Sequence, residues 1–174
     1  MHAYNYVSTQ FNIPSVFIAS CPACDHNFKH FFCLLTCSPD QATFANVTSV
    51  QLAHDNNNTA VASVAYYVAP SYGTAVFNSC KDVVYSAGNQ RAMFYIGGGA
   101  TDYQQWFDYV GMVKDKRVPP IGSPYQLDFP PLEGMPGSLS PMDDQVPACW
   151  DAAYRCGCSD CPDAPPCAPV RCGH

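Results

Sequence analysis

Apolar residues recur with a helical period in residues 22–36. Phe28, Phe31 and Leu35 are spaced by three and four positions, the spacing that places side chains on one face of an α-helix. Pro39 follows closely, and because the residue before a proline is displaced from helical backbone angles, the helix is expected to end there. The pattern therefore predicts a helix that begins at Pro22.

Residues 47–52 and 61–68 are rich in valine and tyrosine, and a polar stretch at 55–59 separates them. This arrangement is typical of two strands joined by a turn. Three further helices are predicted from proline starts, apolar spacing and glycine ends. They are a helix of about ten residues from Pro70, a short helix over residues 90–96 closed by Gly97-Gly98-Gly99, and a helix over residues 102–113.

The two ends of the chain lack a clear period. Residues 3–20 mix apolar and polar positions, with Pro14 as a break or as the first residue of a helix. Residues 117–141 are proline-rich and are expected to be extended, and the segment from Cys149 onward holds six cysteines but too few apolar side chains to fold without disulfides. The expected class is α+β: several helices packed around a small mixed β-sheet, disulfide-rich, with an irregular proline- and cysteine-rich C-terminal part.

Composition excludes several functional classes. The net charge of −6 argues against non-specific nucleic-acid binding, which requires a basic surface. No stretch approaches roughly 18 uninterrupted apolar residues, so no membrane span is expected. The first residues also lack the basic region and apolar run of a signal peptide.

The chain has 11 cysteines in 174 residues, a frequency typical of an oxidising compartment. Two glycosylation sequons, at Asn46 and Asn57, agree with a secretory location. From the odd cysteine count and the lack of a visible signal peptide, we expect an excised or truncated piece of a longer protein.

The run CPACDHNFKHFFCLLTC, at residues 21–37, suggests three kinds of chemistry. A rise of 1.5 Å per helical residue separates His26 from Cys37 by roughly 16 Å, too far to share a zinc ion with bonds of about 2.0–2.3 Å. Cys21 and Cys24 could instead form half of a zinc ribbon, completed by Cys158 and Cys161, or a redox pair at the start of a helix. The sequons and the odd cysteine count favour disulfides, so we expect no bound metal and no cofactor.

No catalytic constellation is visible. Nothing resembles a nucleophile elbow. The glycine run at residues 97–99 lacks the lysine of a phosphate loop and is interpreted as a hinge or helix cap. Asp143 and Asp144 are most simply explained as solvated loop residues, so the chain is not expected to be an enzyme.

The stretch CPACDHNFKHFFCLLTCSPDQATFANVTSV resembles the luminal N-terminal domain of the Niemann-Pick type C1 sterol transporters, whose motif combines the same cysteine spacing with T-C-S-P, a glutamine and N-V-T. The similarity continues through YYVAPSYGTAVFNSCKDV, WFDYV, RVPPIGSP, DFPPLEGM and CGCSDC, and so covers essentially the whole chain.

The resemblance implies four disulfides: Cys21–Cys156, Cys24–Cys80, Cys149–Cys161 and Cys158–Cys167, with Cys172 as an alternative partner for Cys158. Cys33 and Cys37 match family cysteines that pair with an earlier part of the domain, so these two and Cys172 are expected to be unpaired here.

The family's domain binds a sterol in a deep apolar pocket. Wall positions carried over by matching are Val7, Phe32, Thr36, Tyr95, Ile96, Trp106, Tyr109, Pro119 and Pro120. Core packing is the competing interpretation for Phe32, Trp106 and Tyr109. Pro119-Pro120 replaces a Pro-Phe pair, and the family glutamine that holds the sterol hydroxyl falls at Ala3, so the hydroxyl is held differently or the pocket is incomplete in this chain.

The resemblance implies binding of cholesterol or a related sterol at residues 1–148, the C-terminal two-thirds of the family's domain, with residues 149–174 as a disulfide-stapled tail. Expected partners are a sterol, a small soluble luminal carrier and the transmembrane part of the full-length transporter, in the lumen of late endosomes or lysosomes. An exposed apolar rim at Tyr95 and Ile96, with Tyr109, would face the carrier. The alternatives are a secreted interaction module that binds no sterol and a zinc-binding module.

Overall fold

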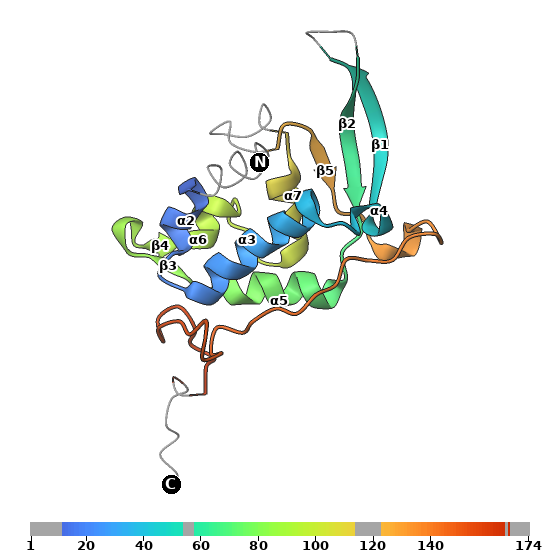
Figure 1. Cartoon of the computed structure of the whole chain (residues 1–174). Coiled ribbons are helices and arrows are strands. Elements are labelled where there is room, and N and C mark those ends of the chain that lie inside the picture. Colours follow the sequence, from blue (N-terminus) through green and yellow to red (C-terminus); the bar gives the residue numbers. More distant parts are fainter. Residues whose placement is uncertain (1–11, 54–57, 114–122, 166, 168–174) are drawn as a thin grey trace. The chain divides into compact units, whose positions relative to one another are not determined.

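The computed structural model describes residues 12–53, 58–113, 123–165 and Cys167 (Figure 1). It divides the chain into two compact units that alternate along the sequence. The first unit contains Met1–Phe31, Ala75–Gly99 and Val146–His174, and the second contains Phe32–Thr74 and Ala100–Gln145.

Two helices contribute to both units. Helix α3 (Pro22–Cys37) confirms the helix predicted from the apolar period, and α5 (Pro70–Cys80) confirms the helix predicted from Pro70. The first ten residues of α3 and the last six of α5 belong to the first unit, and the remainder of each belongs to the second.

The first unit also contains α2 (Asn12–Ile18), β3 (Val84–Tyr85), the 3₁₀ turn η1 (Ser86–Gly88), β4 (Gln90–Arg91) and α6 (Ala92–Ile96). Helix α2 packs against α6 and β3. Pro14 is the third residue of α2, a position where its missing N–H leaves no helical hydrogen bond unmade.

The helix predicted over residues 90–96 begins later than expected. Asn89 adopts a left-handed backbone angle, φ 48°, and turns the chain so that β4 pairs antiparallel with β3 before α6 begins. At the other end of α6, the N–H groups of Gly97 and Gly99 both donate to the carbonyl oxygen of Met93. Gly98 and Gly99 have φ of 60° and 81°, so the glycine run is a helix cap, as glycine's freedom in the left-handed region allows.

The second unit contains α4 (Gln41–Phe44), β1 (Ala45–Leu52), β2 (Thr59–Tyr66), α7 (Tyr103–Gly111), β5 (Gln126–Asp128) and the 3₁₀ turn η3 (Leu132–Gly134). The strand order is β1-β2-β5, antiparallel and then parallel, which confirms a small mixed sheet. The predicted second strand ends earlier than residue 68, and Val68 forms an isolated parallel bridge with Met142.

Helix α7 packs directly against β5. A Cβ placed on Gly111 would lie 2.2 Å from the carbonyl oxygen of Leu127, so only glycine permits this close approach. Burial follows the helix period: Trp106, Phe107 and Val110 are buried, whereas Asp108 is exposed.

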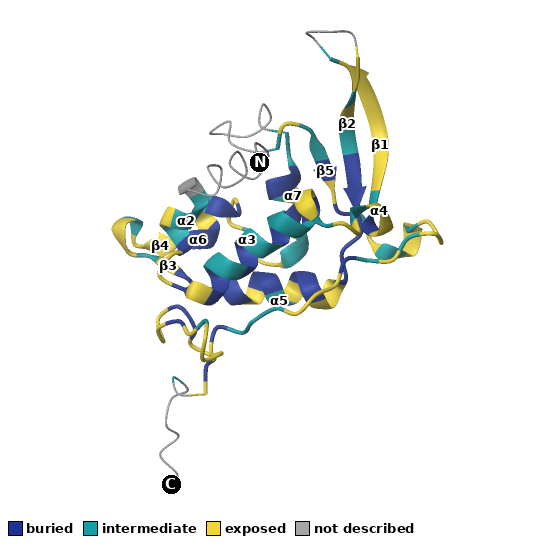
Figure 2. Ribbon diagram, viewed as in Figure 1, coloured by how far each residue is buried: buried dark blue, intermediate teal, exposed yellow. Residues whose placement is uncertain are grey.

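The β1–β2 hairpin confirms the two predicted strands, and its burial is uneven (Figure 2). Strand β1 is exposed beyond its first residue, including Val47, Val50 and Leu52. Strand β2 becomes buried only at its end, from Val64 to Tyr66. The strand pattern in the sequence therefore predicts the pairing but not which side chains are buried.

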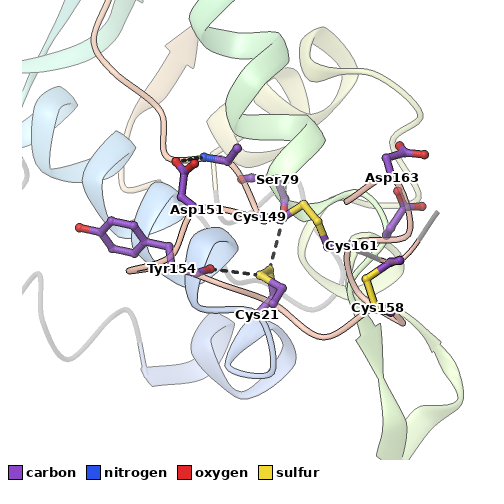
Figure 3. The surroundings of a disulfide bond; sticks show 12 residues. Cys21, Ser79, Cys149, Asp151, Tyr154, Cys158, Cys161 and Asp163 are labelled. Atoms are coloured by element: carbon purple, nitrogen blue, oxygen red, sulfur yellow. Dashed lines mark hydrogen bonds between the residues drawn. A yellow bond between two sulfur atoms is a disulfide. The ribbon is translucent and has the colours of Figure 1, made fainter. Parts of the chain in front are cut away.

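Four disulfides lie in the first unit: Cys21–Cys156, Cys24–Cys80, Cys149–Cys161 and Cys158–Cys167. They are the pairs that the resemblance implies. Residues 149–165 form a series of turns, and Figure 3 shows Cys149, Cys158 and Cys161 around Cys21. Hydrogen bonds add to the covalent links, from Asn27 Nδ2 to the Pro147 carbonyl oxygen (2.9 Å) and from the Val84 N–H to Asp160 Oδ1 (2.9 Å).

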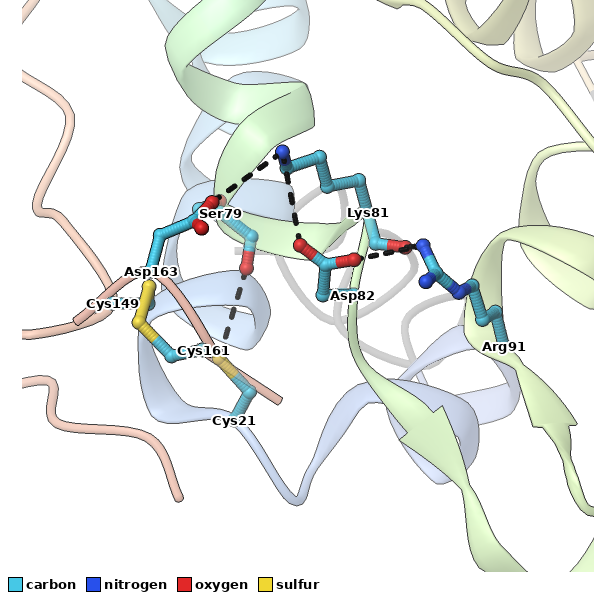
Figure 4. Close-up of polar contacts among 8 residues, drawn as sticks. All are labelled: Cys21, Ser79, Lys81, Asp82, Arg91, Cys149, Cys161 and Asp163. Carbon is cyan, nitrogen blue, oxygen red and sulfur yellow. Dashed lines mark hydrogen bonds and ion pairs between the residues drawn. A yellow bond between two sulfur atoms is a disulfide. The ribbon is translucent and has the colours of Figure 1, made fainter. Parts of the chain in front are cut away.

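Charged side chains also connect the end of α5 to its neighbours in the first unit (Figure 4). Arg91 Nη1 lies 2.7 Å from Asp82 Oδ1, and Lys81 Nζ lies 3.7 Å from carboxylate oxygens of both Asp82 and Asp163. Partly exposed ion pairs contribute little stability individually, so the disulfides are the stronger restraint here.

Candidate functional site

Phe32 and Thr36 lie one turn apart near the C-terminal end of α3. Phe32 is half-buried and Thr36 is exposed. The Thr36 hydroxyl donates to the Phe32 carbonyl oxygen at 2.7 Å, a bond back to the preceding turn that is common for helical threonine. Its proton is therefore already used within the helix, and the oxygen remains as an acceptor.

A polar network that the sequence did not predict surrounds the Leu35 carbonyl oxygen in the same turn. The Tyr66 hydroxyl donates to this oxygen at 3.1 Å, and the side-chain amide of Gln41 donates to it as well. Gln41 Nε2 also lies 3.3 Å from the Tyr66 hydroxyl oxygen. Burial, with Tyr125 nearby, raises the pKa of Tyr66, so its hydroxyl stays protonated. No local sequence pattern identifies this network, because its residues come from three separate elements.

Cys33 and Cys37 carry free thiols, the two found among the residues that the structure describes. They are one helical turn apart on α3. Burial raises the pKa of Cys33, and Cys37 adds to the shift. Because the thiolate is the reactive form, Cys33 is a weak nucleophile in this setting. Cys172 lies outside the described residues.

Helix α7 supplies Trp106 and Tyr109 to the second unit. Trp106 is 1% exposed and lies beside Phe107 with ring centroids 6.0 Å apart, whereas Tyr109 is only half-buried. Phe107 in turn contacts Phe129, with ring centroids 5.1 Å apart. Trp106 therefore belongs to the packed core, while Tyr109 retains surface that a ligand could cover.

Tyr95 and Ile96 lie on α6 in the first unit. The Tyr95 ring stacks on Phe17 (4.9 Å between centroids) and meets Tyr85 edge-on (5.4 Å). The prediction of an exposed rim is wrong for Ile96, which is buried; the exposed apolar side chain of α6 is Phe94, at 61% exposure. The helix turns Ile96 toward the interior while its neighbour two residues earlier faces outward.

The candidate wall residues divide between the two units. Tyr95 and Ile96 belong to the first, and Phe32, Thr36, Trp106 and Tyr109 belong to the second. Val7, Pro119 and Pro120 lie outside the described residues, as do Ala3 and the second sequon asparagine, Asn57.

The histidines of α3 lie next to the C-terminal segment. The rings of His26 and His30 are nearly parallel, with centroids 5.8 Å apart, and the His26 ring lies 4.4 Å from that of Tyr154. Burial lowers the pKa of His26, and the neighbouring His30 lowers it further, while Asp25 opposes the shift.

The sulfurs proposed as zinc or redox groups are all in disulfides with other partners. Cys21 and Cys24 are bonded to Cys156 and Cys80, and Cys158 and Cys161 are also paired. Both the zinc-ribbon and the CxxC redox interpretations are therefore wrong for this structure. Across the described ranges, no group of three or more histidine, cysteine or acidic side chains is arranged to hold a metal ion.

Among the described residues, no helix combines the length and the apolar character needed to cross a membrane.

The protein is therefore of the disulfide-linked α+β class, with aromatic residues on α3, α6 and α7. Residues 4–172 match the family model described as Niemann-Pick C1 N terminus. Since this match covers nearly the whole chain, the protein belongs to that family.

Curated relatives agree with this assignment. NPC intracellular cholesterol transporter 1 of Sus scrofa is 30% identical over 160 residues, which is 86% of this chain and 12% of that protein. NPC1-like intracellular cholesterol transporter 1 is 26% identical over 94% of this chain in Rattus norvegicus and 28% identical over 86% in Homo sapiens. The chain spans 12–13% of the length of these relatives.

Proposed function

We propose that this chain binds cholesterol or a related sterol in an apolar pocket, and that the sterol is then handed over within an intracellular sterol transport system. The observation that carries the proposal is the family match over residues 4–172, with relatives that are named intracellular cholesterol transporters. Those relatives are named as transporters rather than enzymes, in keeping with a binding role.

The proposed wall consists of the positions carried over from the family: Val7, Phe32, Thr36, Tyr95, Ile96, Trp106, Tyr109, Pro119 and Pro120. Phe32 and Tyr109 are the informative wall positions of the second unit, because both are aromatic and only half-buried. A rigid ring system suits an apolar wall of this kind, since a rigid ligand loses little conformational entropy on binding.

Titration of radiolabelled cholesterol into the refolded, disulfide-bonded chain tests this proposal. We expect saturable binding that excess unlabelled cholesterol displaces and that a fatty acid such as oleate does not. Replacing Phe32 and Tyr109 with alanine should weaken affinity by roughly tenfold or more, since each aromatic contact is worth about 1 kcal/mol. Val50→Ala on the exposed β1 strand is the matched control and should leave affinity unchanged.

Binding that does not saturate, or equal affinity of the Phe32→Ala/Tyr109→Ala and Val50→Ala variants, would contradict the proposed pocket. Either result would favour the second candidate function, a secreted interaction module that binds no sterol. The exposed valine and leucine side chains of β1 favour that candidate, because such residues are available to a protein partner.

We further propose that the sterol arrives from a small soluble luminal carrier and passes to the transmembrane part of a full-length transporter, in the lumen of late endosomes or lysosomes. The glycosylation sequons at Asn46 and Asn57 fit this location. Asn46 lies exposed on β1, where a glycan can be attached without disturbing the core.

The carrier-facing surface is proposed to be the apolar face of α6. Because Ile96 is buried and Tyr95 belongs to the proposed sterol wall, the informative variant replaces only the exposed Phe94 with glutamine. We expect the rate of sterol transfer from the carrier to fall by about tenfold while equilibrium binding of free cholesterol changes little. Unchanged transfer kinetics would place the carrier contact elsewhere.

A further inference from the structure

The second unit contains an apolar groove that none of the candidate sterol-wall residues lines. Its volume is about 240 Å³. Three parts of the unit form it: the chain before and at the start of α5, one face of α7, and the segment that follows β5. The lining residues are Val68, Pro70, Tyr103, Gln104, Phe107, Phe129, Pro130, Pro131, Leu132 and Glu133.

The walls of the groove are held in place by packing and by hydrogen bonds. Tyr103 meets Phe107 edge-on, with ring centroids 5.7 Å apart. A Cβ on Gly73 would lie 2.5 Å from the Tyr103 ring, so α5 packs directly against that side chain. The Gln104 amide nitrogen donates to the Phe129 carbonyl oxygen at 2.8 Å and to Asp108 Oδ1 at 2.9 Å, which links α7 to the segment after β5.

Among the polar side chains of the groove, the Gln104 amide oxygen and the Glu133 carboxylate accept hydrogen bonds, and the Tyr103 hydroxyl can donate or accept. Pro70, Pro130 and Pro131 have no backbone N–H, and the Gln104 amide nitrogen is already engaged. Glu133 contributes a carboxylate that is exposed. An occupant of this groove would therefore be stabilised by donors and by positive charge.

The net charge of the second unit also favours a positively charged occupant. Its sequence segments contain nine acidic and three basic residues, a net charge of −6, whereas the first unit contains five of each and is neutral. The entire net charge of the chain thus belongs to the unit that carries the groove. A field of this sign attracts cationic partners and raises their association rate.

We propose that this groove docks an extended, proline-containing segment of a partner protein that carries an arginine. Aromatic side chains line the grooves that recognise polyproline II segments. An acidic neighbour selects arginine, whose planar guanidinium stacks on aromatic rings and donates to carboxylates. The volume is below the roughly 300–1,000 Å³ of pockets that enclose small ligands, which favours a peptide lying across the groove. The lining of the groove shares no residue with the proposed sterol wall.

The probe is a fluorescein-labelled synthetic peptide of repeated Arg-Pro-Pro triplets, titrated with the full chain and followed by fluorescence anisotropy at physiological salt. We expect saturable binding, with affinity falling as salt rises. Peptides with glutamate in place of arginine, or glycine in place of proline, should each bind about tenfold more weakly or not at all.

The Glu133→Lys variant tests whether the peptide binds at the groove, and Asp40→Lys is the matched control. Asp40 is an exposed acid of the same unit whose side chain makes no cap hydrogen bond. We expect Glu133→Lys to weaken the peptide affinity by about tenfold or more, and Asp40→Lys by less than about twofold.

Absence of saturable binding by the unmodified chain overturns the proposal, as does an equal loss of affinity in the two variants, which would indicate a diffuse charge effect. Equal binding of the glycine peptide also overturns it, because the arginines alone would then explain the interaction. Cholesterol binding by Glu133→Lys should be unchanged, so the result is independent of the sterol proposal.

Discussion

His26 lies where the folded structure disfavours the protonated form of its side chain. Its ring is partly buried beside His30 and Tyr154. Burial first, and then His30, lower the pKa of His26 below its ordinary value, and Asp25 compensates only in part. A protonated His26 is therefore less favourable in the folded chain than in the unfolded chain.

This arrangement predicts a loss of stability in acid. The pKa of His26 is lower in the folded state than in the unfolded state. Its contribution to the stability of the folded chain is therefore present above the ordinary histidine pKa of about 6.5, and it is lost as pH falls through the lowered pKa. The thermal midpoint of the wild-type chain should thus fall more between about pH 7.5 and about pH 5 than that of His26→Gln. Parallel pH profiles of the two proteins, measured by circular dichroism, would contradict this explanation.

The sequence identifies some candidate site residues, but it does not predict how far each is buried or which distant groups it contacts. Phe32 and Tyr109 were predicted as wall residues or core, and the structure leaves both half-buried, whereas Trp106 is fully in the core. The Tyr66 and Gln41 contacts with the Leu35 carbonyl oxygen could not be predicted. Such contacts depend on where the chain folds back, which local residue patterns do not encode.

At the scale of the element, α7 owes its start to a single side chain. Asp102 Oδ1 accepts a hydrogen bond from the Gln105 backbone N–H at 2.8 Å, the N-cap interaction that satisfies a free donor of the first turn. The Gln105 side chain returns the contact: its Nε2 donates to Asp102 Oδ2, and its Oε1 accepts from the N–H of Thr101. The arrangement is a variant of the capping box.

Removing this cap should destabilise the chain measurably. We expect Asp102→Ala to lower the free energy of unfolding by about 1 kcal/mol and the thermal midpoint by roughly 2–4 °C. Asp102→Asn keeps an acceptor at the same place and is expected to retain most of the stability. If both substitutions have the same effect in thermal unfolding, charge rather than the cap hydrogen bond stabilises the helix.

Elements with strong local signals were the ones that the sequence predicted well. Helices α3 and α5 and the β1–β2 hairpin follow from periodicity and proline positions. The start of α6 was predicted too early because Gln90 and Arg91 pair with β3 instead. A strand of two residues carries no periodic signal, since its existence depends on its partner.

At the scale of the whole molecule, covalent links tie together segments that are distant in sequence. Cys24 and Cys80 are 56 positions apart and fully buried, and Cys21 and Cys156 are 135 positions apart. A cross-link of this kind stabilises the fold chiefly by restricting the unfolded chain, and more so for longer loops. The first unit, assembled from three sequence segments, depends on these links.

Replacing Cys24 and Cys80 together with alanine should lower the free energy of unfolding by about 4 kcal/mol, the chain-entropy value for a loop of this length. The control replaces the free thiols Cys33 and Cys37 with serine and should change stability by less than about 1 kcal/mol. Urea unfolding monitored by tryptophan fluorescence gives both values. Equal stability of the two double variants would show that the buried disulfide contributes little beyond packing.

The sequence by itself determined the α+β class, the main helices and the central hairpin, because each depends on neighbouring residues whose spacing is visible in one chain. Its motifs also determined the family, which the match over residues 4–172 establishes. Only the tertiary structure decided that Ile96 is buried while Phe94 is exposed, and that side chains from the start of α5, from α7 and from residues 129–133 form one groove. These features arise from contacts between segments far apart in the chain, and packing rather than local propensity determines them.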